Sequence, residues 1–548
     1  MKSRLFVLFF LIVISQNCIA VWSIREGDPK EVTPRHAIMN QVFPQKEWDA
    51  YPFASQEKME WFRDARYGFF VCHGLSCLWG QEVGWPRRTR KYPDRGIGGI
   101  PDAVYDGGIK ELKMEHFDAE AIVGFAKKAG FKYIVVIAKH HDGFHMWNTK
   151  YSNHKITNSP FGRDYIGEFA NACHKLDMPI GIYYSQRDWF HPDYEPILKT
   201  TGKPGPNHHK YIEYMHNTVR ELLTNYGKID IFWWDSAWWG GMFTADMWDA
   251  DKIEKEIRKL QPNIIINNRA SVPGDFDTPE QRIGSYQKRP WETCIPIGAN
   301  WAWSPGSIKS IKQVLRLLIS TSVGNGNLLL STGFMPDGKL DPAHLERMLE
   351  VGEWLKQYGN TLYGTRGGPW YPGGWGGSTY RGNKVYLHIT RWPGSGKALR
   401  LPIPDQKIVG SKLLTSNGKV KWTYTPNSID FEVAEADRDK IDTIVELTLD
   451  GPVQSVLSSN ELPSIFDELV YGEIISSNAT LKLSSVSKKW DNPAEYFRLF
   501  RGKKAATGFA FCTESEAAPY AISILVLLKK SVASKSLTAE VMSSERRG

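Results

Sequence analysis

The chain has 548 residues, of which 42% are hydrophobic and 23% charged, a composition typical of a globular protein with a large buried core. Its formal net charge of +8 is small for this length, and the sequence has no helix-turn-helix, zinc-finger or RNA-binding signature, so we expect no nucleic-acid partner. The 21 tryptophans and 23 tyrosines favour a protein that stacks its aromatic side chains against sugar rings.

Residues 1–20 have the pattern of a secretory signal peptide. Lys2 and Arg4 precede an apolar run at 5–14, and Cys-Ile-Ala at 18–20 provides a cleavage site. The apolar run is too short to span a membrane, and no later segment is long enough. We therefore expect a secreted protein, periplasmic or extracellular, or lysosomal in a eukaryote. The mature chain would keep five cysteines, an odd and sparse set that argues against a disulfide scaffold.

From about residue 55 to 365, short apolar runs alternate with amphipathic segments. The predicted strands are 68–72, 131–138, 179–185, 228–234, 263–268, a weaker one at 282–286, and 326–331. The predicted helices are 118–129, 165–176, 210–226, 249–260, 308–323 and 342–357. This alternation of strands and helices, in a sequence without a dinucleotide-type glycine fingerprint, favours a (β/α)8 TIM-like barrel over 21–365. In such barrels the chemistry lies on the loops that follow the strands.

The pattern changes after the last of these helices. A connector rich in Gly, Pro and Trp occupies 364–377, and short alternating strands follow at 384–390, 397–401 and 443–449. We therefore expect an all-β sandwich as an accessory domain over 366–450. The remaining segment, 451–548, is predicted to be short and β-rich, with a strand-like run at 521–528.

One predicted strand ends in the sequence Ile-Phe-Trp-Trp-Asp-Ser-Ala at 231–237. Asp235 is a single carboxylate among indoles, which is costly to maintain unless it has a role. Aromatic walls suit sugar rings, and an aspartate held between them suits the nucleophile of a glycosidase. The alternative is an aspartate that only caps the next helix.

A second polar cluster, Lys-His-His-Asp-Gly-Phe at 139–144, follows the strand predicted at 131–138. Consecutive side chains on a strand point to opposite faces, so His140 and His141 can serve one ligand only where the strand end is irregular. Binding of sugar hydroxyls, a metal pair and a structural histidine are the alternatives. The absence of HExxH and CxxC motifs disfavours metal, and we expect no metal and no cofactor.

Glu280 lies 45 residues after Asp235, in Asp-Thr-Pro-Glu at 277–280. Two carboxylates at the ends of neighbouring barrel strands can converge on one bond, where one attacks and the other donates a proton. The alternative is a surface glutamate, and Glu292 is a competing acid. Tyr184 and Arg269 close two further predicted strands.

Together these motifs resemble the α-L-fucosidases of glycoside hydrolase family 29, in the family's order over about 45–450. The matching pieces lie at 66–70, 139–144, 159–164, 181–185, 231–237, 278–280, 291–292, 326–330 and 336–338. The resemblance implies a retaining exo-α-L-fucosidase that acts on fucosylated glycans, with Asp235 as nucleophile and Glu280 as acid/base. The residues that it implies for sugar binding are His140, His141, Tyr184, Trp233, Arg269, Glu82 and Trp85. Glu292, the competing acid, is a further candidate for sugar binding.

The sequence departs from the family pattern after the first strand, where His-Trp-Gly is usual and Cys72-His73-Gly74 stands here. We expect His73 to take over part of the missing histidine's role. The departure keeps open a glycosidase retuned to an α-L-galactoside or a sulfated fucan, and a fucose-binding lectin without catalysis. From about residue 476, and most clearly at 484–494, the chain resembles the opening half of a discoidin-type carbohydrate-binding module.

Overall fold

The computed structural model describes residues 11–13, 45–88, 99–196, 203–235, 244–281, 283, 286–394, 396–426, 428–456, 508–513 and 521–526. The chain divides into two compact units, residues 21–463 and residues 1–20 with 464–548. In the described part of the chain, no helix is both long and apolar enough to cross a membrane.

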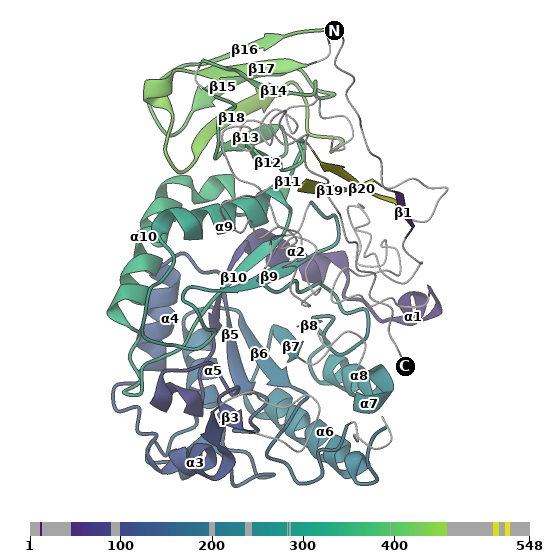
Figure 1. The fold of residues 1–548 in the computed structure, drawn as a ribbon, viewed down its shortest axis with the longest axis vertical. Helices are drawn as coiled ribbons and strands as arrows, with labels where there is room; N and C mark the ends of the chain where they lie inside the picture. The colour runs from purple at the N-terminus through teal and green to yellow at the C-terminus, as the bar shows by residue number, and fades with distance from the viewer. Residues whose placement is uncertain are drawn as a thin grey trace, which may run out of the picture. The chain divides into compact units, whose positions relative to one another are not determined.

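A curled parallel sheet forms the centre of the larger unit (Figure 1). Its strands, in spatial order, are β8 (Ile265–Ile266), β7 (Ile231–Asp235), β6 (Ile180–Ser185), β5 (Tyr133–Lys139), β2 (Tyr67–Val71), β10 (Asn327–Thr332) and β9 (Glu292–Pro296). Residues 276–280 link the two edges, because they form isolated parallel bridges to Asn267, past the end of β8, and to Trp291 and Cys294 beside and within β9. The result is an α/β barrel, as the sequence predicts.

Helices follow most of the strands. They are α4 (Ala119–Lys128), α5 (Tyr165–Lys175), α6 (His208–Asn225), α7 (Ala245–Trp248), α8 (Ala250–Leu260), α9 (Ile311–Val323) and α10 (Pro342–Tyr358). The sequence places their starts well because polar side chains cap them: Asp118 and Asp164 each accept a hydrogen bond from a backbone N–H of the first turn. Ser310 and Gln313 form a capping box at the start of α9.

The region between β8 and β9 differs from the prediction. The weak strand expected at 282–286 falls largely outside the described residues, and 276–280 occupies that position in the ring instead. The prediction also missed β9, whose sequence Glu-Thr-Cys-Ile-Pro lacks a continuous apolar run. Its burial comes from pairing with β10, which the local sequence does not reveal.

Strand alternation divides the barrel into an interior and an exterior layer. Interior side chains from the strands include Phe70, Val135, Tyr183 and Trp233, which pack in one cluster with α2 (Gln56–Ala65). Their sequence neighbours, among them Phe69, Val136, Tyr184 and Trp234, belong to the separate cluster beneath the outer helices. This division decides which side chains reach the site described below.

Short elements complete the barrel. They are α1 (Gln45–Ala50), α3 (Asp102–Gly107), the paired strands β3 (Arg87–Arg88) and β4 (Ile100–Pro101), and the 3₁₀ turns η1 (Leu75–Trp79), η2 (Gly108–Lys110), η3 (Ile156–Asn158) and η4 (Gly359–Thr361). Most of them lie in the segments that follow β2 and β5, at the carboxyl ends of those strands.

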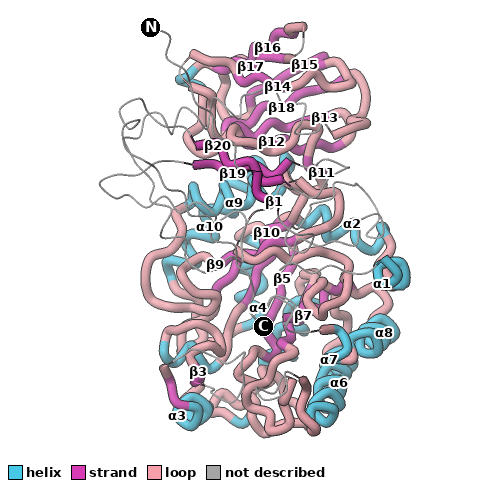
Figure 2. The backbone as a smooth tube through the Cα atoms, turned by 45° about the vertical axis from the view of Figure 1, so that its right-hand side comes forward, coloured by secondary structure: helices cyan, strands magenta, loops and turns pink. Residues whose placement is uncertain are grey.

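Two antiparallel sheets follow the barrel, as the sequence predicts for an all-β segment (Figure 2). One has the order β11 (Arg366–Gly367), β12 (Gly376–Arg381), β13 (Lys384–Ile389), β18 (Thr443–Leu449), β15 (Ile408–Leu413), and the other β14 (Leu399–Leu401), β17 (Ile429–Val433), β16 (Val420–Tyr424). A single hydrophobic cluster joins both sheets. The turn η5 (Glu435–Asp437) lies between β17 and β18. The segment packs on α9, where a side chain at Gly377 would collide with Val323.

In the smaller unit the structure describes β1 (Leu11–Val13), β19 (Gly508–Thr513) and β20 (Ala521–Val526), which pair antiparallel in the order β1-β20-β19. The strand predicted at 521–528 is therefore confirmed for 521–526. The rest of the signal-peptide segment 1–20 and the discoidin-like stretch 484–494 lie outside the described residues. Both stay predictions.

Candidate active site

A cavity opens among the carboxyl ends of the barrel strands, where the sequence predicts the chemistry. Its lining consists of Phe70, Cys72, Val83, Trp85, Ile137, His140, His141, Tyr183, Trp233, Asp235, Arg269, Glu280, Cys294 and Trp301. These residues come from the barrel interior and from the loops after β2, β5, β8 and β9. The lining combines charged and polar groups with aromatic, aliphatic and thiol side chains.

Asp235 is the last residue of β7 and is buried to 6% exposure. Its Oδ2 accepts a hydrogen bond from the Tyr183 hydroxyl at 2.5 Å, and its Oδ1 accepts one from Nη1 of Arg269 at 2.9 Å. His141 lies farther away, with its Nε2 at 3.7 Å from Oδ2. The carboxylate is thus held in one orientation from two sides.

Glu280 faces the same arginine from the irregular segment 276–280. Its Oε2 lies 3.0 Å from Nη1 of Arg269, the nitrogen that also contacts Asp235 at 2.9 Å. The two carboxylate oxygens are therefore at most about 5.9 Å apart, the sum of these two distances. The Glu280 side chain is 25% exposed, so Glu280 lies toward the opening while Asp235 lies deeper.

Arg269 organises this pair of carboxylates. Its guanidinium donates to the side chain and the backbone oxygen of Thr278, at 2.9 and 3.1 Å, and lies over the Trp233 ring at 4.6 Å. Burial disfavours the charge of Arg269, but Glu280 and Asp235 outweigh it and raise the pKa of the arginine above its ordinary value. A permanent cation therefore lies between the two acids.

Both histidines of the 139–144 motif line the cavity. The register of β5 against β6 shifts between Ile137 and Lys139, which is the strand-end irregularity that the sequence argument required. Burial lowers the pKa of His140 to about 3 and the pKa of His141 well below its ordinary value. Each is therefore a neutral imidazole at physiological pH, able to donate one hydrogen bond and accept another.

His140, His141 and Asp235 also have ligand atoms within 4.8 Å of one another, the spacing of a metal site. The environment of Asp235 disfavours a cation there, because both of its oxygens already accept hydrogen bonds and one of their donors is the guanidinium of Arg269. Placing a divalent ion at this carboxylate would bring two positive groups together. That no metal or cofactor is needed stays a prediction.

Two aromatic residues expected at the site are found there. Trp233 lies inside the barrel and Trp85 on the loop after η1, and both line the cavity. Trp85 makes edge contacts with the rings of His141 and Trp189, each at 5.2 Å between centroids. These contacts hold its indole in place at the opening.

The expectation for Tyr184 is wrong. Strand alternation places Tyr183 inside the barrel, where it bonds Asp235, and Tyr184 outside, where its hydroxyl lies 2.8 Å from that of Thr218 on α6. The sequence does not distinguish these two adjacent tyrosines, because only the register of β6 decides which of them faces the barrel interior.

The expectation for His73 is also wrong, since Cys72 occupies the cavity side. The His73 ring packs against Tyr165 and Phe334, and its Nε2 lies 3.3 Å from the sulfur of Met114. Burial in this apolar layer lowers the pKa of His73 to about 3. The residue that departs from the family pattern at the cavity is therefore the cysteine.

Glu292 and Glu82 lie next to the cavity but are not part of its lining. Glu292, on β9, is fully buried and accepts hydrogen bonds from the Tyr133 hydroxyl and from Nε1 of Trp233. It therefore supports the wall of the cavity from below and does not compete with Glu280 as an acid facing it. The Glu82 carboxylate accepts hydrogen bonds from backbone N–H groups, as described below.

Sequence reasoning missed several lining residues, chiefly Tyr183, Cys294 and Trp301. Tyr183 was within the motif that identified its neighbour, and Cys294 lies two residues after Glu292 on the missed strand β9. Trp301 lies in the loop between β9 and α9, for which no motif was recognised. Knowledge of β9 would have pointed to both later residues.

The buried carboxyl of Glu292 predicts a pH-dependent stability. Burial raises its pKa to about 7, against the opposing effect of the Tyr133 and Trp233 hydrogen bonds. The folded chain therefore keeps a proton that the unfolded chain loses at about pH 4.3, so Glu292 costs stability increasingly as the pH rises from about 4.5 to 7. We expect Glu292→Gln to gain about 3 kcal/mol relative to the wild type between pH 4.5 and pH 8, measured by urea unfolding at both values. A difference that does not change with pH would contradict this assignment.

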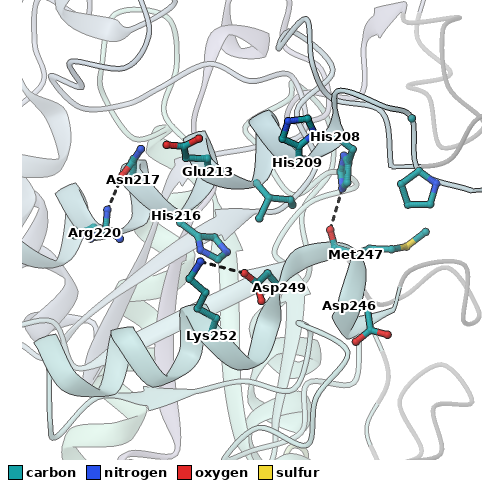
Figure 3. Close-up of a pocket in the computed structure, with 13 residues that line it drawn as sticks. His208, His209, Glu213, His216, Asn217, Arg220, Asp246, Met247, Asp249 and Lys252 are labelled. Atoms are coloured by element: carbon teal, nitrogen blue, oxygen red, sulfur yellow. Dashed lines mark hydrogen bonds and ion pairs between the residues drawn. The ribbon is translucent and has the colours of Figure 1, made fainter.

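A larger cavity of about 720 Å³ lies elsewhere, between α6 and the pair α7 and α8 (Figure 3). Its charged groups are mostly paired with one another or with neighbours: Lys252 lies 3.5 Å from Asp249, Arg220 donates to Asn217, and His208 contacts the backbone oxygen of Met247. Among the described residues that line this cavity, no two carboxylates converge on a shared cation. The smaller cavity at the strand ends is therefore the candidate active site.

Comparison with known proteins agrees with this geometry. A family model described as alpha-L-fucosidase matches residues 36–360. The tissue alpha-L-fucosidases of Rattus norvegicus and Homo sapiens are each 26% identical to the chain, over 67% of its length and 83% of theirs. Among solved structures, alpha-L-fucosidase isoenzyme 1 from Paenibacillus thiaminolyticus is 31% identical, with a TM-score of 0.64, over 72% of this chain and 99% of the other.

Proposed function

The chain belongs to the alpha-L-fucosidase family of glycoside hydrolases, and on that premise we propose that it is a secreted enzyme that removes terminal α-L-fucosyl residues with retention of configuration. The observation that carries the mechanism is the single nitrogen of Arg269 that contacts both Asp235 and Glu280. Oδ1 of Asp235 and Oε2 of Glu280 are at most about 5.9 Å apart, which suits the carboxyl separation of about 5–5.5 Å in retaining enzymes better than the about 6.5–9.5 Å of inverting enzymes.

In the first step, a carboxylate oxygen of Asp235 attacks the anomeric carbon and the bond to the leaving oxygen breaks. Glu280 donates its proton to that oxygen, so the leaving group departs as a neutral alcohol. Tyr183 and Arg269 hold the Asp235 carboxylate during the attack. The deeper position of Asp235 and the partial exposure of Glu280 fit these roles, since the leaving group must depart toward the opening.

In the second step, Glu280 accepts a proton from water, and the water oxygen attacks the anomeric carbon. The bond to Asp235 breaks, which releases the sugar with its original configuration and returns both carboxyl groups to their starting states. A structure of a related family 29 enzyme from Bacteroides thetaiotaomicron, 22% identical, is described as a trapped covalent intermediate with 2-fluoro-fucosyl fluoride, which supports a glycosyl–enzyme species in this fold.

Recognition of the sugar is assigned to the groups around the two carboxylates. The neutral imidazoles of His140 and His141 suit hydroxyl groups, and the Trp233 ring suits an apolar sugar face. Arg269, whose pKa stays high, provides a fixed positive charge beside the reacting centre. We propose in addition that residues 1–20 direct the protein to secretion and that 451–548 forms part of a carbohydrate-binding segment, both on the sequence evidence given above.

A panel of aryl glycosides tests the function. We expect turnover of an aryl α-L-fucoside, turnover of the α-L-galactoside that is lower by up to about 100-fold, and none of a β-D-galactoside. The reason is that the added hydroxyl of galactose would lie against apolar lining, and such a pocket rejects an extra hydroxyl only modestly. Faster turnover of the α-L-galactoside than of the α-L-fucoside would show that the enzyme is an α-L-galactosidase of this family. Binding of L-fucose by calorimetry without turnover of any substrate would assign the lectin alternative.

A further inference from the structure

The opening of the cavity is marked by the exposure of its lining residues. Of those lining residues, Trp85, Glu280 and Trp301 are partly exposed, while the rest are buried. Solvent therefore reaches the site past two tryptophans and the proposed acid. Among the described residues, these three side chains border the opening through which a substrate group would extend.

Trp301 is held in place although it lies in a loop. Its backbone N–H donates to the Glu82 carboxylate at 2.9 Å, and its backbone oxygen accepts a hydrogen bond from Ser331 Oγ at 2.7 Å. Its ring also meets Phe70 of β2, at 6.3 Å between centroids. The backbone of Trp301 is thus held by hydrogen bonds on both sides of the residue, and its indole packs near Phe70.

Glu82 makes these contacts as part of a small network of backbone donors. Besides Trp301, it accepts hydrogen bonds from the N–H groups of Val83 at 2.7 Å and Ala302 at 3.4 Å. Burial raises the pKa of Glu82 to about 7 in spite of these donors. Its oxygens therefore face the loop after β9, and its structural effect on the site is to position Trp301.

We propose that Trp301 and Trp85 form the binding surface for the leaving group of the substrate, a second sugar ring or an aryl group, and that Glu82 and Ser331 position Trp301 for this task. The proposal rests on the proposed function, because a general acid must lie beside the leaving oxygen, and Glu280 is the partly exposed carboxylate at the opening. Tryptophan faces suit the apolar faces of sugar rings and aromatic groups. The Trp85 ring packs against His141, and the backbone that carries the Trp301 ring is held by Glu82 and Ser331.

The test compares leaving groups of different size. The probes are α-L-fucosyl fluoride, whose leaving atom is too small to reach a tryptophan at the opening, and an α-L-fucosyl disaccharide, with free L-fucose as an inhibitor. For Trp301→Ala we expect the ratio of kcat/KM for the disaccharide to that for the fluoride to fall about tenfold, the effect of losing one stacking contact. The inhibition constant of L-fucose should stay within twofold of the wild type.

Trp303→Ala is the matched control, because Trp303 is in the same loop and partly exposed but is not part of the lining. It should leave the ratio within twofold. Ser331→Ala, which removes the bond to the Trp301 backbone, should lower the same ratio by raising KM for the disaccharide more than it lowers kcat.

Two outcomes would overturn the proposal. Equal losses on the fluoride and the disaccharide in Trp301→Ala, with weaker inhibition by L-fucose, would place Trp301 on the fucose side of the cleaved bond. An unchanged ratio would remove it from substrate binding. Wild-type protein that hydrolyses neither probe would instead refute the proposed function, which keeps the two failures distinct.

Discussion

Replacement of Asp235 by alanine is expected to lower kcat for an aryl α-L-fucoside by roughly 10⁴-fold or more while the protein stays folded. The variant loses the proposed nucleophile, while Arg269 keeps its contact with Glu280 and its two hydrogen bonds to Thr278. Azide should restore part of the activity, because a small anion fits the space left by the carboxylate and attacks from the same face. The product should be β-L-fucosyl azide, formed by a single inverting displacement.

The comparison for this experiment is Asp235→Asn, which keeps the shape of the side chain and leaves no space for azide. It should be as inactive as the alanine variant and should not respond to azide. Thermal unfolding of both variants should remain cooperative. An alanine variant that keeps more than about 1% of wild-type kcat, or that yields no fucosyl azide, would remove Asp235 as the nucleophile.

Replacement of Glu280 by alanine is expected to act according to the leaving group. Hydrolysis of a fucosyl disaccharide should fall by roughly 10²- to 10⁴-fold, because its leaving oxygen needs a proton, whereas a dinitrophenyl α-L-fucoside should form the glycosyl–enzyme nearly as fast as the wild type. Azide should then attack that intermediate and give α-L-fucosyl azide. The two variants should therefore yield opposite anomers, which nuclear magnetic resonance distinguishes.

Glu292→Gln is the matched control for the acid, since Glu292 is a buried glutamate beneath the same cavity that contacts Trp233 and Tyr133. It should show no selectivity between good and poor leaving groups. If Glu280→Ala damaged both substrates equally, the acid would have to be reassigned. If Glu292→Gln showed the selectivity instead, the competing acid of the sequence analysis would be correct.

Much of the barrel was predictable because its signals are local. The helices α4, α5, α6, α8, α9 and α10 were each predicted to within a few residues, since amphipathic periodicity and capping residues such as Asp118 and Asp164 act over one or two turns. The strands β2, β5, β6 and β10 are mostly apolar runs, because strands of a parallel sheet are buried on both faces. The strand β9 lacks such a run and was missed.

The candidate site was predictable for those residues whose type and place at a strand end were enough to identify them. Asp235 and Glu280 were named from their positions after strands together with the family resemblance, and Arg269 from the resemblance. The structure brings all three together. His140 and His141 were named on the condition of an irregular strand end, and the register shift in β5 meets that condition. The roles of these residues in catalysis stay predictions until the variants above are measured.

The sequence by itself, through its local patterns and its resemblance to the family, thus predicted the class of fold and placed the two carboxylates and the two histidines at strand ends, because these depend on residue type and on position along a strand. Tertiary structure alone decided between Tyr183 and Tyr184, and between Cys72 and His73, because a shift of one residue moves a side chain to the other face of a strand. It also decided that Glu82 positions Trp301, since a contact between residues 219 positions apart depends on how two loops pack and leaves no local pattern in the chain.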